Sequence, residues 1–524
     1  MILTVLRWAS LSVILGVSVW LLWPETGDEV EEERRTRDAK HVIRFSPGMS
    51  YMPGTSPFGI GAQLEGFRQI AREFEAIRPD TQIEFLNVPV VREYLVTQLS
   101  GGQAPDIINV NVEDVWVDIH KGWYVPLDPW LEAPNIFIRE QGDPSQPGYD
   151  QWWDMFKYQA VSRGKAAPDG LNYCLTFDMI ETGVYYNKNI FAEVGVDIPE
   201  TWEEFIEIMG KIKEARYIPI LMVIDNLNDW AVDLMFDQLY HEILPGIDLI
   251  QDPVREQYLE GYLDGEELTF LFQEKGFFSH EDNRYRELWR LLYEYRQYCN
   301  QNIATIDMIR EFVTQQAAMI WNSSPLTYRL AADRELGFEW GVFYLPPMTR
   351  KTSPYASGVD MCVIGGSATQ LEVTNRSFSD TGDPATSERL VRVMEFLQFI
   401  TVPENYDRVV NEYTCFLPNI IGVEPREALQ PFAEILERRY TTTKWTFSFD
   451  LKFSEIQRRM LELYLNDGIN LDEFMDWQVS NMDAATLNML RRVEIDLDEM
   501  HEAWDRLAPV REDYFDLPTQ AMEE

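Results

Sequence analysis

The sequence is poor in cysteine, in histidine and in positive charge. Its four cysteines, Cys174, Cys299, Cys362 and Cys415, are far apart, and no two stand at the short spacing of a structural zinc site. We therefore expect isolated thiols and no metal site. Acidic residues number 87 against 45 basic ones, so the net charge is −42. A surface this acidic repels phosphate backbones, which excludes a nucleic-acid partner.

Catalytic signatures are also missing. None of the five histidines stands in an HExxH pattern, and the chain has neither a G-x-S-x-G elbow nor a GxxxxGK[ST] loop. Two carboxylates held about 5–10 Å apart can hydrolyse a glycosidic bond, but a chain this rich in acids is expected to contain such pairs by chance. We therefore predict that the protein is not an enzyme and has no catalytic residue and no cofactor. A glycan-active enzyme is the less favoured alternative.

The amino terminus carries one long apolar stretch. Residues 8–23, WASLSVILGVSVWLLW, hold no charge and are followed by Pro24 and a run of acids. Extended back to Met1, the stretch reaches about the 20 residues that a helix needs to cross a bilayer. No small-x-small cleavage site follows it, and its tryptophans suit a membrane interface. We predict a signal anchor at 1–24, with a cleaved signal peptide as the alternative, and a charged tether at 25–40.

From His41 onward, short apolar strands alternate with amphipathic helices. Helical spacing of apolar residues over 64–77, and the segment 91–102 closed by two glycines, predict helices between strands at 41–47, 82–88 and 106–112. This alternation predicts a mainly parallel sheet with helices on both faces, in which ligands bind beyond the carboxyl ends of the strands. Further amphipathic helices are expected at 279–298, 387–400 and 453–466.

Several motifs, in order along the chain, resemble one family. They are FEAIRPDTQIEFLNVP (74–89), YLVTQLSGGQAPDIINVN (94–111), the block 177–205 with YYNK and TWEEF, AAMIWNSSPL (317–326), FYLPPM (343–348), YASGVDMCVIGG (355–366) and EYTCFLPN (412–419). Their order and spacing resemble the family 1 extracellular solute-binding proteins, the maltose-binding-like receptors of ABC importers. The block 177–205 carries the resemblance most strongly.

The resemblance implies an α/β, periplasmic-binding-protein-like fold: two α/β lobes joined by three hinge crossings, with a ligand cleft between them. The first lobe would combine residues 41–178 with 361–415. The second would combine 184–357 with 419–510, and a tail would follow at 511–524.

The resemblance also implies a receptor outside the cytoplasm, in the periplasm or at the cell surface, and here anchored to the cytoplasmic membrane. Such a receptor captures a small solute, expected to be a sugar or an oligosaccharide, and delivers it to ABC transporter permease subunits by hinge closure. We expect a monomer. The alternative is a membrane-tethered ligand sensor or scaffold with the same fold.

Sugars present polar edges and apolar faces, so their sites need carboxylates or amides together with flat aromatic rings. Residues of these kinds follow several of the expected strands and crossings. The candidate ligand-binding residues are Asn111, Glu113, Asp178, Asn228, Asp229, Trp230, Trp321, Asn322 and Asp360. Asn228 or Asp229 would equally suit a helix cap, and Asp360 a hinge. Trp202, in TWEEF, is expected to pack at the start of a helix rather than to bind ligand.

Overall fold

The computed structural model describes residues 39–518, apart from 57–58, 60, 89–91, 112–113, 116–117, 158–166, 168–169, 251–262, 264, 365, 437–438, 443–446, 448–450 and 493–494. The predicted anchor at 1–24 and nearly all of the predicted tether lie outside these residues. Within them, no helix combines the length and the apolar character needed to cross a membrane.

The first lobe is built on a five-stranded sheet in the order β2 (Thr81–Phe85), β1 (His41–Ser46), β3 (Ile107–Asn109), β11 (Gln370–Val373) and β4 (Cys174–Thr176). β1 runs parallel to β2 and β3, whereas β11 runs antiparallel to β3 and β4. The expected mainly parallel sheet is therefore confined to the first three strands. Between β4 and β11 the chain forms most of the other lobe. These two strands are therefore not linked by a helical crossover within the first lobe, which is the connection that parallel neighbours need.

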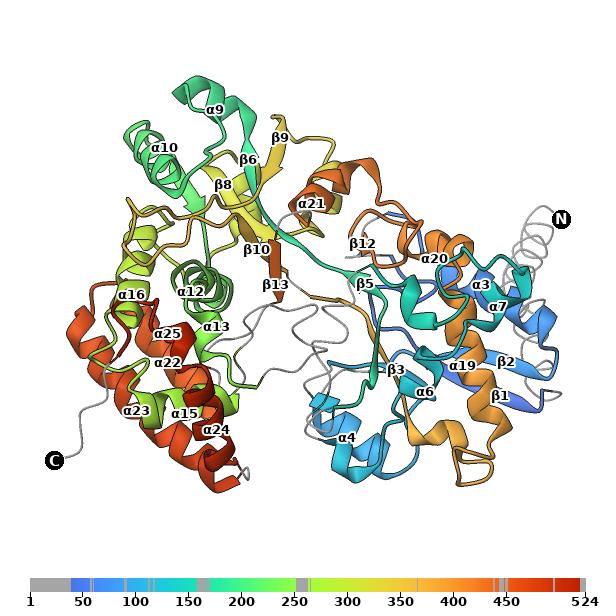
Figure 1. Ribbon diagram of the computed structural model, residues 1–524. Coiled ribbons are helices and arrows are strands. Elements are labelled where there is room, and N and C mark those ends of the chain that lie inside the picture. Colours follow the sequence, from blue (N-terminus) through green and yellow to red (C-terminus); the bar gives the residue numbers. More distant parts are fainter. Residues whose placement is uncertain are drawn as a thin grey trace, which may run out of the picture.

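Helices pack around this sheet (Figure 1, right-hand half), and its apolar side chains are buried in one core. Phe45 of β1 meets Phe67 with ring centroids 5.1 Å apart and Phe396 at 5.7 Å, so one strand residue joins two helices. Those helices are α3 (Gly66–Ile77) and α19 (Glu388–Ile400), close to the predicted 64–77 and 387–400. The lobe also contains α4 (Arg92–Ser100), α6 (Asp128–Leu131), α7 (Ile136–Gln141), α20 (Pro403–Val410) and the 3₁₀ turns η2 (Ile119–Lys121), η3 (Trp152–Met155) and η5 (Asn375–Phe378).

The second lobe is built on a four-stranded sheet in the order β7 (Ile218–Leu221), β8 (Ala317–Ser323), β6 (Thr182–Asn187) and β9 (Trp340–Phe343). β7 and β8 are parallel, and β6 is antiparallel to β8 and to β9. The helices and turns around it are α9 (Lys188–Val194), α10 (Trp202–Glu214), α11 (Ile224–Asn226), η4 (Leu227–Ala231), α12 (Val232–Tyr240), α13 (Leu244–Ile247), α15 (Gly265–Lys275), α16 (Asn283–Arg296), α17 (Met308–Val313), α18 (Leu326–Ala332), η6 (Glu427–Leu429), α21 (Gln430–Ile435), α22 (Leu451–Leu465), α23 (Leu471–Arg492), α24 (Leu497–Arg506) and α25 (Ala508–Arg511).

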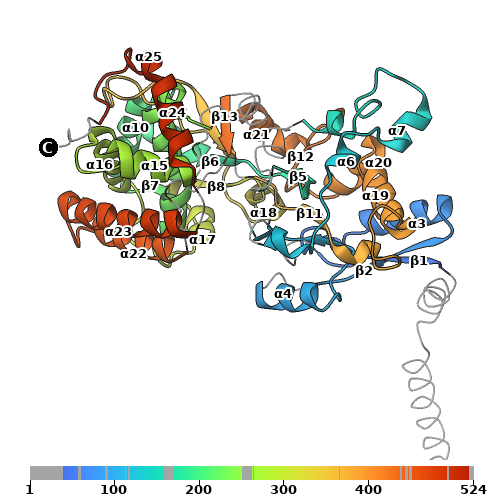
Figure 2. The ribbon, with the colours of Figure 1, turned by 60° about the horizontal axis from the view of Figure 1, so that its bottom comes forward.

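The chain passes between the lobes through short paired segments (Figures 1 and 2). β5 (Asp178–Met179) pairs antiparallel with β12 (Leu417–Pro418), which joins two of these passages. β10 (Met361–Ile364) pairs in parallel with β13 (Arg439–Thr442). All four cysteines are free thiols.

The structure corrects three of the expected boundaries. Cys362 of β10 packs in the core of the second lobe, because β13 pairs with that strand over four residues. Ile420 and Val423 pack in the core of the first lobe. The chain therefore returns to the first lobe after residue 361, later than expected, and enters the second lobe again after residue 419, which is also later than expected. The start of the expected tail is not free either, since the Phe515 ring stacks on Tyr355 with centroids 5.9 Å apart.

Substitution of Trp202 tests the packing of the apolar core of the second lobe. This residue is 2% exposed and contacts the rings of Phe205 and Tyr295 at 5.5 and 5.6 Å, as its predicted packing role requires. Trp202→Ala should lower the free energy of unfolding by about 3–5 kcal/mol, because it leaves a large cavity. Urea denaturation followed by circular dichroism measures this. Val391→Ala, at a side chain 48% exposed, is the control and should change little; equal effects of the two changes would contradict the packing role.

Candidate functional site

Two parallel strands of the second lobe end side by side and bring candidate residues together. After β7 the chain enters α11 and then η4, which carries Asn228, Asp229 and Trp230. The neighbouring β8 carries Trp321 and Asn322 just before its last residue, Ser323. Because parallel neighbours present their carboxyl ends at one edge of a sheet, these residues converge. The ring centroids of Trp230 and Trp321 are 5.7 Å apart, with an interplanar angle of 52°.

The two tryptophans have different environments. Trp321 is fully buried and also meets Tyr344 edge-on, with centroids 6.3 Å apart. Its indole nitrogen has no hydrogen-bond acceptor in the described part of the chain. Trp230 is only half-buried. Trp321 therefore supports the ring of Trp230 from within the core, and Trp230 is the ring whose surface can meet a solute.

Asn228 and Asp229 form the polar part of this cluster. The Asn228 amide donates to Asp229 Oδ1 at 2.9 Å, and its oxygen accepts from Gln457 Nε2 of α22 at 3.2 Å. Burial, together with the nearby carboxylates of Asp233 and Asp225, raises the pKa of Asp229 to about 6 in spite of the Asn228 hydrogen bond. This carboxyl can therefore act as an acceptor at neutral pH and as a donor in mild acid.

The backbone around these residues is a π-helical turn rather than a capped helix start. η4 runs directly between α11 and α12, and the residue that precedes α12 is Ala231, with no side-chain cap. The alternative reading of Asn228 or Asp229 as the cap of that helix is therefore wrong. Single π-turns inside helices occur frequently at functional sites.

The other candidate residues come from other elements of the chain. Asn111 is exposed, two residues beyond the end of β3, and Glu113 lies outside the described residues. Asp360 is exposed in the passage that leads into β10. The last residue of β3 is instead Asn109, whose side-chain oxygen accepts from the Gln370 N–H at 2.9 Å and so fixes β11.

Asp178 is a buried residue of the first passage between the lobes. Its carboxylate accepts from the N–H groups of Ala368 and Thr369 at 2.8 and 3.0 Å and from Ser367 Oγ at 3.1 Å. It thereby ties β5 to the segment that follows β10. Burial raises its pKa to about 6 in spite of these hydrogen bonds. The observed contacts of Asp178 are all within the protein, and a contact with ligand stays a prediction.

Several residues that contact this cluster were not among the candidates predicted from the sequence. Gln457 and Arg458 come from α22, more than 200 residues beyond Asp229, and Arg458 Nη1 lies 3.5 Å from Asp225 Oδ1. Tyr344 stands behind Trp321 after β9. No local pattern in the sequence indicates these neighbours, since only the folding of the C-terminal helices against the sheet brings them here.

Residues 61–259 match the family described as bacterial extracellular solute-binding protein. The multiple sugar-binding protein of Streptococcus mutans is 24% identical over 155 residues, which are 30% of this chain and 32% of that protein. The chain thus aligns with about a third of the length of that curated relative.

Solved structures are similar over most of the chain. A chitin oligosaccharide binding protein superimposes with a TM-score of 0.58 at 16% identity, covering 85% of this chain and 99% of that one. The sugar-binding protein MalE from Xanthomonas citri gives 0.57 at 16% identity, over 86% and 100% of the two chains. The periplasmic-binding-protein fold and the resemblance to family 1 solute-binding proteins are thereby confirmed.

The titration of Asp178 predicts a specific pH dependence of stability. The folded-state pKa of Asp178, about 6, lies above the ordinary carboxyl value. Its protonated carboxyl therefore stabilises the folded protein below about pH 4, and this stabilisation is lost as the pH rises through 6. Asp178→Asn should remove this dependence, so the difference in unfolding free energy between variant and wild type should change by about 2–3 kcal/mol from pH 4 to pH 7. Urea titrations at both pH values measure it. Asp150→Asn, at an exposed carboxylate, should follow the wild type; a constant offset for Asp178→Asn would contradict the assignment.

Proposed function

We propose that this chain, whose residues 61–259 match the bacterial extracellular solute-binding proteins, is a receptor that captures a sugar or oligosaccharide between its two lobes. The receptor would hand its solute to the permease subunits of an ABC importer. The names of its relatives support a carbohydrate, because they include a multiple sugar-binding protein, a maltotriose-binding protein and a chitin oligosaccharide binding protein.

The observation that carries this proposal is the cluster at the ends of β7 and β8. The half-buried Trp230 offers an apolar plane for the C–H face of a sugar ring, and Trp321 keeps that plane in place. Asn228 and Asp229 stand beside it in the chain and provide an amide and a carboxylate for hydroxyl groups. An aromatic plane flanked by polar groups is the chemistry that a sugar requires.

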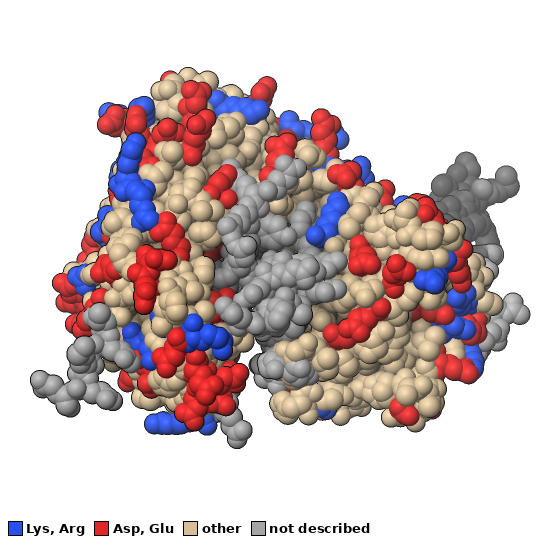
Figure 3. All heavy atoms as spheres, viewed as in Figure 1, with Lys and Arg blue, Asp and Glu red and all other residues tan. Residues whose placement is uncertain are grey.

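The remaining candidate residues enter the proposal through closure of the lobes. Asn111 and Glu113 would complete the site from the first lobe, and Asp360 from the passage between the lobes. Figure 3 shows the two lobes separated by a notch at the lower edge of the view, with acidic side chains spread over both. Rotation about the paired passages would bring the first-lobe residues towards Trp230.

The cellular setting of the proposal rests on the sequence of the amino terminus. Residues 1–24 would anchor the receptor to the cytoplasmic membrane, with the globule as a monomer outside the cytoplasm.

The same anchor favours a second candidate function, a tethered sensor or scaffold that passes no solute on. Genes for two permeases beside this one would support import, whereas a neighbouring histidine kinase gene would support sensing. Unmodified sugar after incubation with the protein would separate a receptor from a glycan-active enzyme.

Substitution of Trp230 tests this proposal most directly. Mass spectrometry of solute that co-purifies with the protein identifies a ligand, and calorimetry then measures its affinity. Trp230→Ala should weaken binding about tenfold, because it removes a stacking plane worth about 0.5–1.5 kcal/mol together with its buried area.

The matched control is Trp123→Ala, at a half-buried tryptophan of the first lobe whose ring centroid lies 4.4 Å from the ammonium of Lys121. This variant should bind as the wild type does. Unchanged affinity of Trp230→Ala, in a protein whose unfolding is also unchanged, would remove the cluster from the ligand site.

A further inference from the structure

Gln457 of α22 is a buried residue whose side chain reaches the candidate sugar site. It is 3% exposed, and its Nε2 donates to the Asn228 oxygen at 3.2 Å. Its own side-chain oxygen is buried and has no hydrogen-bond partner in the described part of the chain. The hydrogen bond that the structure describes for this side chain is therefore directed at the site and not at the fold around it.

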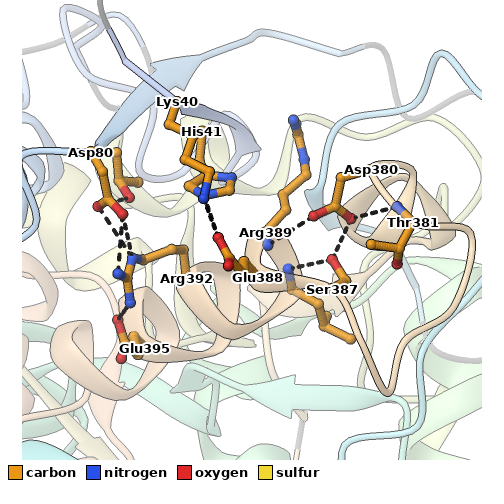
Figure 4. A network of polar contacts seen from close by, with 12 residues as sticks. Lys40, His41, Asp80, Asp380, Thr381, Ser387, Glu388, Arg389, Arg392 and Glu395 are labelled. Atoms are coloured by element: carbon orange, nitrogen blue, oxygen red, sulfur yellow. Dashed lines mark hydrogen bonds and ion pairs between the residues drawn. The ribbon is translucent and has the colours of Figure 1, made fainter.

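Helix α19 of the first lobe shows the opposite arrangement. Figure 4 shows the polar network around this helix, in which Arg392 is paired with Asp80. Gln398 of the same helix is buried and uses both ends of its amide, because it donates to the Pro134 carbonyl at 3.2 Å and accepts from the Ile136 N–H at 3.3 Å. Such an amide serves the fold on both sides.

Stability alone does not account for a glutamine at position 457. A buried polar atom without a partner costs free energy, and an apolar side chain of the same length would avoid that cost. The residue that gains from the amide of Gln457 is Asn228, which is only half-buried and belongs to the π-helical turn η4. The role of Gln457 is therefore to be sought in what its N–H does to Asn228.

The contact decides which way the Asn228 amide points. An amide has an acceptor at one end and two donors at the other, so its two orientations present different groups. The Gln457 N–H needs an acceptor, which turns the Asn228 oxygen towards α22 and its NH₂ group towards Asp229 Oδ1, 2.9 Å away. The site then presents amide donors beside a carboxylate. A sugar hydroxyl can accept from the one and donate to the other.

Asp229 alone does not hold this orientation at every pH. Burial raises the pKa of its carboxyl to about 6; Asp233 of α12 and Asp225 of α11 raise the pKa as well, and Arg458 of α22 lowers it. Once protonated, the carboxyl is itself a donor and favours the amide in the reverse orientation. The N–H of Gln457 does not titrate, so it opposes that reversal above and below pH 6.

We propose that Gln457 is a positioning residue of the sugar site, which keeps the donors of the Asn228 amide turned towards Asp229 and so sets the preference of the site for a hydroxyl group. The inference rests on the proposed function, since it requires Asn228 and Asp229 to meet the sugar. Gln457 is buried and acts through Asn228.

The test replaces Gln457 by Met in the full-length protein, which removes the N–H and keeps the length of the side chain. Carbon NMR of protein labelled at the aspartate carboxyl carbons measures the pKa of Asp229, assigned with Asp229→Asn. This pKa should rise in Gln457→Met, because the free amide can reverse and stabilise the protonated carboxyl. The free energy of unfolding in urea should not fall, because water can replace the lost partner of the half-buried Asn228.

Sugar affinity is the second readout. Calorimetry is run with maltotriose, raffinose and chitotriose, sugars of the kinds named for similar proteins. With the sugar that the wild type binds, Gln457→Met should weaken binding about three- to tenfold. The pKa of Asp229 is measured without sugar, so it decides whether Gln457 positions Asn228 even if none of the three binds.

The matched control is Gln398→Met, which makes the same exchange at a buried amide that is paired at both ends. It should lower the free energy of unfolding and leave the pKa of Asp229 and the affinity unchanged. The inference is overturned if Gln457→Met leaves that pKa unchanged, or if it leaves the affinity unchanged while Trp230→Ala weakens binding. Unchanged affinity in both Gln457→Met and Trp230→Ala would overturn the proposed sugar site as a whole, and this inference with it.

Discussion

The buried carboxylate of Asp178 holds together the region on which the two-lobe structure depends. It accepts two backbone N–H groups and one hydroxyl from residues 367–369, so it joins the first passage between the lobes to the second. A carboxylate removed from water is costly unless hydrogen bonds replace its hydration. These donors replace it only in part, as the raised pKa shows. The passages are therefore fixed relative to each other while each lobe keeps its own core.

This constraint connects the fold to the proposed function. Each lobe buries its own apolar core around its own sheet, so the lobes can rotate without unpacking either one. In the proposed closure, the dihedral changes would fall on the short paired passages. A solute that touches both lobes only in the closed form shifts the population towards closure by its difference in affinity for the two forms. In the proposed function, the cluster around Trp230 would provide the half of that contact which is formed before closure.

Much of the fold could be predicted from local patterns. Apolar residues at helical spacing predicted α3 and α16, and TWEEF predicted a packed Trp202 at the start of α10. The antiparallel strand β11 could not be predicted in the same way, because its partner β3 lies more than 260 residues earlier in the chain. The passages after 361 and 419 were placed too early for a similar reason, since the pairing of β10 with the distant β13 decides where the chain changes lobe.

The candidate site could be predicted only in part. The sequence indicated the segment 228–230 and the pair Trp321 and Asn322 as separate candidates near strand ends, and the structure brings Trp230 and Trp321 into contact. The sequence did not indicate that Trp321 would be buried as a support, nor that α22 would place Gln457 beside Asn228. Burial and long-range packing are properties of the whole chain.

The central claim is that the lobes close on a solute, and small-angle X-ray scattering tests it most directly. The protein is measured without ligand and with a sugar whose saturating binding calorimetry has established independently. The account predicts a smaller radius of gyration with the sugar, because the lobes rotate together about the passages held by Asp178. An unchanged radius of gyration at full saturation would contradict it.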